Sequence, residues 1–474
     1  MIRRVLLAAC LTVPFWDLGH PLWEVDDARY AEVPREMAEG GDWLTPRLNG
    51  MEYVEKPPLW FWLGAASYKV FGISEAAARL PLAALSLLGV GAVLWAGTWL
   101  FGPSTAAAAA AVLSSSGLWF LLSHGMTVDL PLAVFLTWGV AFALRALLRP
   151  EDARWAAPAA WTAAALAFLS KGLIALVLPG AWVLVLLWAV PRLRAGLPRL
   201  FHPAGPAIFA ALTLPWALAL QERHGDFFQV FFLEQHFQRF LTAKYNRPGP
   251  WYYYFVWLPV GLLPWTPAAL HGFFSALKNP DRGSESAAAA KALALWAAVV
   301  VLFFSTSRSK LLTYALPAVP ALCLLAARVI EEDLPAWSRK LAVGVAVLAA
   351  AGAALGPILL DHFAPERIDA GASWLLSGAL AALAAGLLLY RKLRPQWIVI
   401  AACGLFSGAL GLGAARRAED RVSVRPLARS AAERLKPGDL VYSYGTYPHG
   451  LSFYLGRRVD RMIYWIGELH VAKR

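Results

Sequence analysis

Residues 79–101 read RLPLAALSLLGVGAVLWAGTWLF, and after Arg79 this stretch carries no charged residue. A run of about 20 apolar residues is long enough to cross the ~30 Å hydrocarbon core of a membrane as a helix. Comparable runs recur along the chain. We predict thirteen spans, near 4–18, 79–101, 105–122, 128–148, 156–170, 172–190, 204–220, 251–275, 288–304, 311–329, 341–360, 372–390 and 396–415. The predicted fold class is therefore an all-α polytopic membrane protein.

The composition supports a membrane protein and argues against several other classes. Of the 474 residues, 59% are hydrophobic and only 16% are charged, against roughly 25% charged in soluble domains. The 22 tryptophans suit a protein with two lipid–water interfaces. We assign the net charge of +12 to cytoplasmic loops and to sites for lipid phosphates, so no nucleic-acid partner is expected. The three cysteines, Cys10, Cys323 and Cys403, lie within apolar runs and indicate neither a disulfide framework nor a cysteine-rich metal site.

The distribution of Lys and Arg predicts the orientation of the spans. With a cytoplasmic N-terminus, and with residues 58–71 lying in the interface instead of crossing it, nearly every inside loop is basic, as the positive-inside rule requires. The basic residues of these loops are Arg3, Arg4, Arg149, Arg154, Arg192, Arg194, Arg199, Lys278, Arg282, Arg339, Lys340, Arg391, Lys392 and Arg394. We expect a transmembrane domain over 1–415 in a bacterial inner membrane. Its outer side comprises a first loop at 19–78, a second at 221–250 and a small C-terminal region at 416–474.

The C-terminal region differs in character from the spans. Residues 441–444 (VYSY) and 451–454 (LSFY) are typical of short strands, and residues 436–439 (KPGD) form a turn sequence before the first of them. We predict a small strand-containing cap on the outer side.

The first outer loop is unusually acidic for a connector between two spans. Between Asp17 and Glu55 it holds ten acidic residues, with Arg29, Arg35 and Arg47 among them. One interpretation is a solvated loop whose charges pair with one another. The other is an active site at the membrane surface, where carboxylates act as acid or base and cations hold phosphate.

Three blocks of this loop resemble the first outer loop of the aminoarabinose transferase (ArnT) family. They are Asp26–Val33 (DDARYAEV), Gly41–Gly50 (GDWLTPRLNG) and Tyr53–Leu59 (YVEKPPL). Later segments that fit the family include Glu234–Phe240 (EQHFQRF) and Ser309–Leu311 (SKL) with Tyr314. The family belongs to the protein-mannosyltransferase-like group with the GT-C fold. The chain departs from its pattern at Asp27, where the family often has Glu, and in a shorter tail, which leaves the acceptor open.

The resemblance implies a chemistry and a set of site residues. The donor would be a sugar on a polyprenyl phosphate, so no nucleotide is needed, and Gly89-Val90-Gly91 lies inside a span instead of forming a phosphate loop. Asp26 matches the catalytic aspartate of the family. Lys56 and Arg239 are the expected cations for the lipid phosphate, and Arg29 and Tyr30 complete the predicted donor site. Asp129, at the outer end of a span, is a second catalytic candidate, although it could equally cap its own helix.

The resemblance also suggests a divalent metal, with zinc the expected ion. Its ligands would be Glu55, His236 and His449, one from each outer segment, and carboxylate and imidazole are ordinary zinc ligands. Sequence spacing alone gives no support for the set, because the three residues are far apart along the chain.

The leading function is transfer of a sugar, aminoarabinose-like or other, from undecaprenyl or another polyprenyl phosphate to lipid A or a related envelope glycan, by a monomer. The alternative within the enzymes is a protein O-mannosyltransferase-like activity that uses polyprenyl-phosphate mannose. A lipid or sugar transporter is the alternative of another class, but transporters place charges near the membrane midplane, and most spans here lack them. An envelope scaffold would not need the acidic loop.

Overall fold

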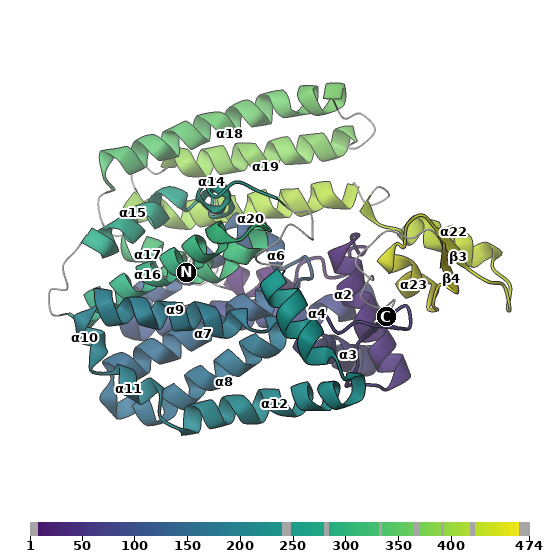
Figure 1. The fold of residues 1–474 in the computed structure, drawn as a ribbon. Coiled ribbons are helices and arrows are strands. Elements are labelled where there is room, and N and C mark those ends of the chain that lie inside the picture. Colours follow the sequence, from purple (N-terminus) through teal and green to yellow (C-terminus); the bar gives the residue numbers. More distant parts are fainter. Residues whose placement is uncertain are drawn as a thin grey trace.

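The structure is a computed structural model, and it describes residues 8–238, 248–278, 284–330, 334–363, 369–389, 393–417 and 422–463. The chain folds into a bundle of helices, with only four very short strands in these ranges. Figure 1 shows α18 and α19 on one side of the bundle and α8 and α12 on the other. The helices of the bundle are α4 (Glu75–Phe101), α5 (Pro103–Ser114), α6 (Gly117–Leu122), α7 (Asp129–Leu148), α8 (Ala153–Lys171), α9 (Ile174–Ala189), α10 (Pro191–Arg194), α11 (Leu197–Leu200), α12 (Ala204–His224), α14 (Tyr253–Gly261), α15 (Thr266–Lys278), α16 (Glu285–Thr306), α17 (Val319–Arg328), α18 (Ala336–Phe363), α19 (Ala370–Leu388) and α20 (Leu393–Arg417). Short 3-10 or π segments lie at η1 (Val13–Phe15), η2 (Pro150–Asp152), η3 (Gln229–Gln238) and η4 (Leu312–Ala318).

Several of these helices have the length and composition of membrane spans. Within the described ranges seven meet this criterion, namely Glu75–Phe101, Asp129–Leu148, Leu197–His224, Glu285–Thr306, Ala336–Ile358, Gly371–Leu388 and Trp397–Arg417. Apolar side chains on their outer faces are exposed, as at Leu348 (73%) and Ile358 (66%), which suits contact with lipid. The all-α membrane fold is confirmed, whereas the count of thirteen spans stays a prediction. The predicted span 4–18 begins outside the described ranges.

Three predicted spans are interrupted in the structure. The span predicted at 105–122 is divided into α5 and α6 at Ser115 and Ser116, whose hydroxyls bond to the carbonyls of Ala111 and Leu113. The span predicted at 251–275 is divided into α14 and α15 around Pro264, which has no N–H to continue a helix. The span predicted at 311–329 consists of η4 followed by α17. Serine and proline at these points end one helix within a continuous apolar run.

The first outer loop packs as a compact unit on one end of the bundle. It contains α2 (Asp26–Gly40), the two-residue antiparallel strands β1 (Arg47–Leu48) and β2 (Met51–Glu52), and α3 (Leu59–Phe71). The Trp60 indole N–H donates to the carbonyl of Tyr30 at 2.9 Å, and Gly64 lets α3 approach Pro34 of α2 closely. With 13 residues, α3 is about 20 Å long, too short to cross a ~30 Å core. Its length is consistent with the predicted interfacial helix.

The C-terminal region is a small α/β unit, and one of its predicted strands was wrong. It contains α22 (Arg425–Arg434), β3 (Tyr442–Tyr444), α23 (His449–Leu455) and β4 (Arg461–Ile463). The strand predicted at 441–444 is confirmed as β3, but residues 451–454 belong to helix α23. Because β3 and β4 pair in parallel, the chain must cross over between them, and α23 makes this connection.

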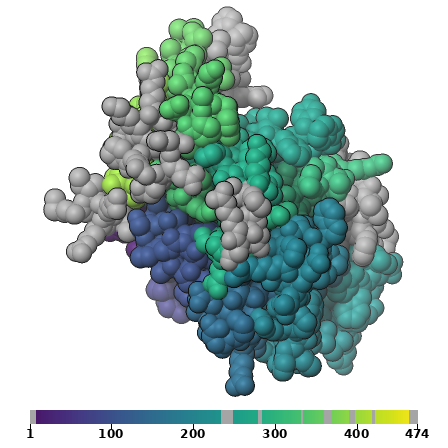
Figure 2. Space-filling model, turned by 90° about the vertical axis from the view of Figure 1, so that its left-hand side faces the viewer, coloured from purple at the N-terminus to yellow at the C-terminus, as the bar shows by residue number. Residues whose placement is uncertain are grey.

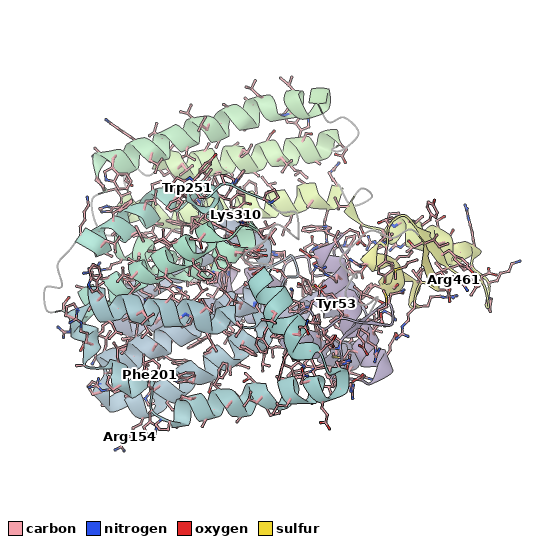
Figure 3. All side chains as sticks on the ribbon, in the orientation of Figure 1. Tyr53, Arg154, Phe201, Trp251, Lys310 and Arg461 are labelled. Atoms are coloured by element: carbon pink, nitrogen blue, oxygen red, sulfur yellow. The ribbon has the colours of Figure 1, made fainter. Side chains whose placement is uncertain are left out.

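The two ends of the bundle differ in character. Figure 1 places α2, α3 and the C-terminal unit at one end, and α10 and α11 at the other. In Figure 3, Tyr53 and Arg461 lie toward the first end, whereas Arg154 lies at the opposite end. Figure 2 looks onto that opposite end, where segments from the middle of the chain form most of the visible surface. The acidic first loop and the basic α10–α11 segment therefore lie at opposite ends of the bundle.

Candidate active site

A cavity of about 930 Å³ opens beside the N-terminal end of α2. One part of its wall is apolar and includes Leu121, Ile174, Val177, Phe303 and Phe304. The other part is charged. Six of the residues predicted from the sequence line the cavity, namely Asp26, Arg29, Tyr30, Glu55, Lys56 and Asp129. The cavity therefore offers an apolar surface next to a cluster of carboxylates and cations.

Asp26 and Asp27 begin α2, where acidic side chains are favoured by the positive end of the helix dipole. The Asp26 side chain is 49% exposed and forms an ion pair with Arg29, which is itself 6% exposed. The Arg29 guanidinium also lies 5.4 Å from the ring centre of Tyr30 and 5.9 Å from that of Tyr53. Asp26 thus presents an accessible carboxylate to the cavity, on a helix end held by buried neighbours.

Asp27 is in a different environment although it is the next residue. Its side chain is 5% exposed and accepts hydrogen bonds from Arg79 Nη2 at 2.5 Å, from the Met126 amide at 2.8 Å and from the Trp23 amide at 3.2 Å. Asp27 also lines the cavity, but both of its oxygens are already engaged by buried donors, unlike the half-exposed carboxylate of Asp26. The structure thus separates the two adjacent aspartates, and the accessible one is the predicted catalytic Asp26.

Asp129 begins α7 and faces the same cavity. One of its oxygens pairs with Lys171 at the end of α8, and the other accepts from the Thr127 hydroxyl at 3.1 Å. The Lys171 ammonium also lies 4.2 Å from the ring centre of Tyr314. Lys171 was not predicted as a site residue. The available signal was a single lysine between two apolar runs, on the side of the acidic loop.

The residues predicted as metal ligands are only partly described. Glu55 is 6% exposed on the cavity wall, and His449 is 6% exposed at the start of α23. His236 lies in η3, but its side chain is outside the described part of the chain, as is all of Arg239. Among the side chains that are described, no group of three His, Cys, Asp or Glu residues is placed to hold a metal. The metal therefore stays a prediction.

Glu24 joins the cavity wall to the C-terminal region. Its carboxylate accepts hydrogen bonds from the amides of His449 at 3.0 Å and Gly450 at 2.7 Å. Burial raises the pKa of Glu24 to about 7, against the effect of these two N–H groups, which lower it. Asn49 adds a second link, because its amide group bonds both the N–H and the carbonyl of Val459. These contacts place His449 at the edge of the site, and sequence reasoning did not identify Glu24.

A buried histidine stabilises the loop before α2. His20 is 2% exposed, and its Nδ1 is 2.7 Å from the carbonyl of Asp17. Burial, and then the nearby Arg79 guanidinium, lower the pKa of His20 to about 3. The neutral ring, with Nδ1 as the donor, is therefore the form present in the folded protein.

Comparison with known proteins gives matches over most of the chain. Residues 55–218 match the profile of the family described as dolichyl-phosphate-mannose-protein mannosyltransferase. A relative named undecaprenyl phosphate-alpha-4-amino-4-deoxy-L-arabinose arabinosyl transferase from Pectobacterium carotovorum is 31% identical over 83% of this chain and 72% of its own length. One of the same name from Pectobacterium atrosepticum is 33% identical over 73% of this chain and 63% of its own length. The chain thus spans less than two thirds of that relative.

Solved structures show the same architecture. The structure of ArnT from Cupriavidus metallidurans bound to undecaprenyl phosphate is 29% identical, with a TM-score of 0.85 over 99% of this chain and 86% of that chain. The archaeal oligosaccharyltransferase AglB from Archaeoglobus fulgidus, in complex with an inhibitory peptide and a dolichol-phosphate, is 12% identical, with a TM-score of 0.53 over 96% of this chain and 64% of that chain. The second likeness concerns the fold alone.

Proposed function

The chain is a multi-pass membrane protein of the undecaprenyl phosphate-alpha-4-amino-4-deoxy-L-arabinose arabinosyl transferase family, and from this premise we propose that it is a glycosyltransferase. It takes a sugar, aminoarabinose or a similar one, from undecaprenyl or another polyprenyl phosphate and transfers it to lipid A or a related envelope glycan. One observation carries the proposal: a single cavity brings Asp26, Lys56 and Asp129 together beside an apolar wall. That combination suits a donor with a phosphate head and a lipid chain.

The cavity suggests how the donor is held. Its lipid chain lies along the apolar wall, and its phosphate binds to cations at the polar end, where charge-assisted hydrogen bonds are strongest. Lys56 and Arg29 line the cavity there, with Tyr30 beside the guanidinium. Arg239 is proposed as a further phosphate ligand from the second outer segment. The bound phosphate is also the leaving group of the reaction.

Transfer then forms one bond and breaks another. An oxygen of the acceptor attacks the sugar carbon, and the bond to the phosphate oxygen breaks, with its electron pair leaving on the polyprenyl phosphate. If the acceptor is a hydroxyl, Asp26 removes its proton. If the acceptor is itself a phosphate, which is already ionised, Asp26 stabilises the positive charge that develops at the sugar carbon. Asp129, paired with Lys171, is a second carboxylate for charge stabilisation in the same cavity.

We also propose that Glu55, His236 and His449 hold one divalent ion, with zinc as the ion suited to a carboxylate and two imidazoles. The position of Glu55 on the cavity wall supports this, as does the burial of His449 where the C-terminal region meets Glu24. The ion would add a fixed positive charge and fasten the first loop to the C-terminal region.

For location, we propose the bacterial inner membrane, with the active site on the periplasmic side. Residues 1–415 would form the transmembrane domain and 416–474 a small outer region. The separation of the acidic first loop from α10 and α11, which carry Arg192, Arg194 and Arg199, supports this orientation. In a Cys403→Ala background, a cysteine at Ser430 should react with an impermeant reagent from outside, and one at Ala195 only after the membrane is opened. Reversed labelling would place the site in the cytoplasm.

A protein O-mannosyltransferase-like activity is the second candidate, favoured by the profile match over residues 55–218. Mass spectrometry of lipid A, envelope glycans and glycoproteins, from cells with and without the gene, separates the two. The leading proposal predicts a sugar that is lost from lipid A or a glycan and restored by the wild-type gene, but not by Asp26→Asn. A sugar lost only from proteins would favour the second candidate.

A further inference from the structure

Two of the carboxylates that line the cavity, Asp26 and Asp129, come from segments that are far apart in the sequence. Asp26 is the first residue of α2, and Asp129 is the first residue of α7. Both line the same cavity. The distance between Asp26 and Asp129 depends on contacts between the first outer loop and the loop that precedes α7. Asp27 makes one such contact.

Asp27 joins the two segments directly. Its Oδ1 accepts the Met126 amide at 2.8 Å, and Met126 lies three residues before Asp129. Its own backbone is adjacent to Asp26. The Asp27 side chain therefore links the α2 end that carries one carboxylate to the loop that carries the other. Thr127, within that loop, bonds Asp129 in turn.

Arg79 fixes Asp27 from the other side. This arginine is 0% exposed and sits near the start of α4, and its Nη2 donates to Asp27 Oδ2 at 2.5 Å. The same guanidinium donates to three carbonyls of the loop before α2, those of Leu18, His20 and Pro21. The ion pair thus ties the loop, α2 and the segment before α7 to one helix of the bundle. Because a planar guanidinium donates in fixed directions, the arrangement is geometrically specific.

We propose that the buried Arg79–Asp27 pair is a positioning device that sets the separation of Asp26 and Asp129 across the donor cavity. The inference rests on the proposed function, because it assigns Asp26 and Asp129 to the reaction. Arg79 does not line the cavity, and Asp27, which does, already has both oxygens bonded to Arg79, Met126 and Trp23. The pair acts through the Met126 amide, and the quantity that it governs is the rate of transfer in the bound complex.

Three changes test this positioning role. Asp27→Asn replaces one oxygen by an NH₂ group, which then faces either the Met126 N–H or the Arg79 guanidinium, so one of the two links is lost. Asp27→Glu keeps the charge and can keep both links. A backbone ester at position 126, made with the α-hydroxy analogue of leucine and compared with Met126→Leu, removes the N–H that donates to Asp27 and leaves every side chain in place, although the ester carbonyl of residue 125 is also a weaker acceptor.

The matched control is Asp152→Asn. Asp152 pairs with Arg145 at 2.6 Å, at the junction of α7 and α8 away from the cavity, so this variant also loses an Asp–Arg pair. The measurements are kcat, the KM for polyprenyl-phosphate sugar and the thermal midpoint of the purified full chain in lipid. Wild-type transfer is measured first, and its absence would be a failure of the proposed function, separate from this inference.

We expect Asp27→Asn to lower kcat about 100-fold, the effect of roughly 1 Å of misplacement, with the donor KM changed less than about threefold. The ester should lower kcat at least about tenfold relative to Met126→Leu, and Asp27→Glu should recover kcat to within about tenfold of wild type. If Asp27→Asn does not fold, the ester decides the question. An unchanged kcat in the ester protein would overturn the proposal. A fall in kcat for Asp27→Asn no larger than the fall for Asp152→Asn would also overturn it.

Discussion

Arg35 offers the sharpest test of what holds α2 in place. Its guanidinium makes two hydrogen bonds of 2.7 Å to Glu32, one turn earlier, and one of 2.5 Å to Glu39. Arg35 is 2% exposed and Glu32 is 0% exposed, whereas the Glu39 side chain is 48% exposed. Arg35→Met would therefore leave the Glu32 carboxylate buried without its cation.

The expected cost follows from these burials. Breaking a buried ion pair by removing one partner costs about 3–5 kcal/mol, because the remaining charge is uncompensated. The half-exposed pair with Glu39 adds at most about 1 kcal/mol. Replacing both members by apolar residues is often nearly neutral, so Glu32→Leu combined with Arg35→Met should recover most of the loss.

The assay is thermal unfolding of the purified chain in lipid nanodiscs, followed by tryptophan fluorescence. Arg154→Met, on the exposed surface of α8, is the control for loss of an arginine. We expect a clearly lower unfolding midpoint for Arg35→Met. The double variant and the Arg154→Met control should have midpoints close to that of the wild type. A double variant as unstable as Arg35→Met, or an Arg35→Met protein with a wild-type midpoint, would refute the reasoning.

Three further predictions concern the site and its surroundings. Lys56→Ala should weaken polyprenyl-phosphate binding about tenfold to a hundredfold, from the ~1.5–3 kcal/mol of a hydrogen bond to a charged group; unchanged binding by titration calorimetry would reduce Lys56 to an interfacial anchor. The pKa of His20 is about 3 in the folded chain and ~6.5 in the unfolded chain, so the unfolded chain binds the proton first as the pH falls. The free energy of unfolding should therefore fall by about 2 kcal/mol between pH 7 and pH 5. His20→Gln should remove that part of the pH dependence, and an identical pH profile would contradict the assignment. Elemental analysis should find one divalent metal ion per wild-type chain and less in His449→Ala, and metal binding should weaken as pH falls through ~6.5. If wild-type protein that was never exposed to a chelator contains no metal, the metal site is refuted.

The fold was largely predictable because crossing a membrane constrains sequence strongly. Each span needs a continuous apolar run, as in residues 79–101, and such runs are visible without knowledge of tertiary contacts. The breaks were not visible, since Ser115 and Pro264 sit inside runs whose average hydropathy is high. Residues 451–454 were misassigned because a four-residue apolar pattern fits either a strand or a helix. The parallel pairing of β3 with β4, which calls for a crossover between them, becomes visible only in the structure, and helix α23 forms that crossover.

The site was predictable where a local motif carries it and not where packing creates it. Asp26, Arg29, Tyr30, Glu55 and Lys56 come from one loop, and the structure brings all of them to the cavity. Lys171 was missed because its pairing with Asp129 depends on how α7 packs against α8.

The contacts of Asp27 and of Glu24 were missed for a similar reason. Nothing in the order of the sequence links Asp27 to Arg79 and Met126, or Glu24 to the start of α23. These contacts form only when the first outer loop closes on the bundle and the C-terminal region closes on that loop.

The most direct test of the central claim is transfer by the purified chain in lipid vesicles. The vesicles would contain undecaprenyl-phosphate aminoarabinose and lipid A, and mass spectrometry would follow the lipid A. The account predicts that wild-type protein produces lipid A bearing the sugar and releases undecaprenyl phosphate, and that folded Asp26→Asn protein does neither. Equal transfer by Asp26→Asn, or no sugar leaving the polyprenyl phosphate with folded wild-type protein, would contradict it.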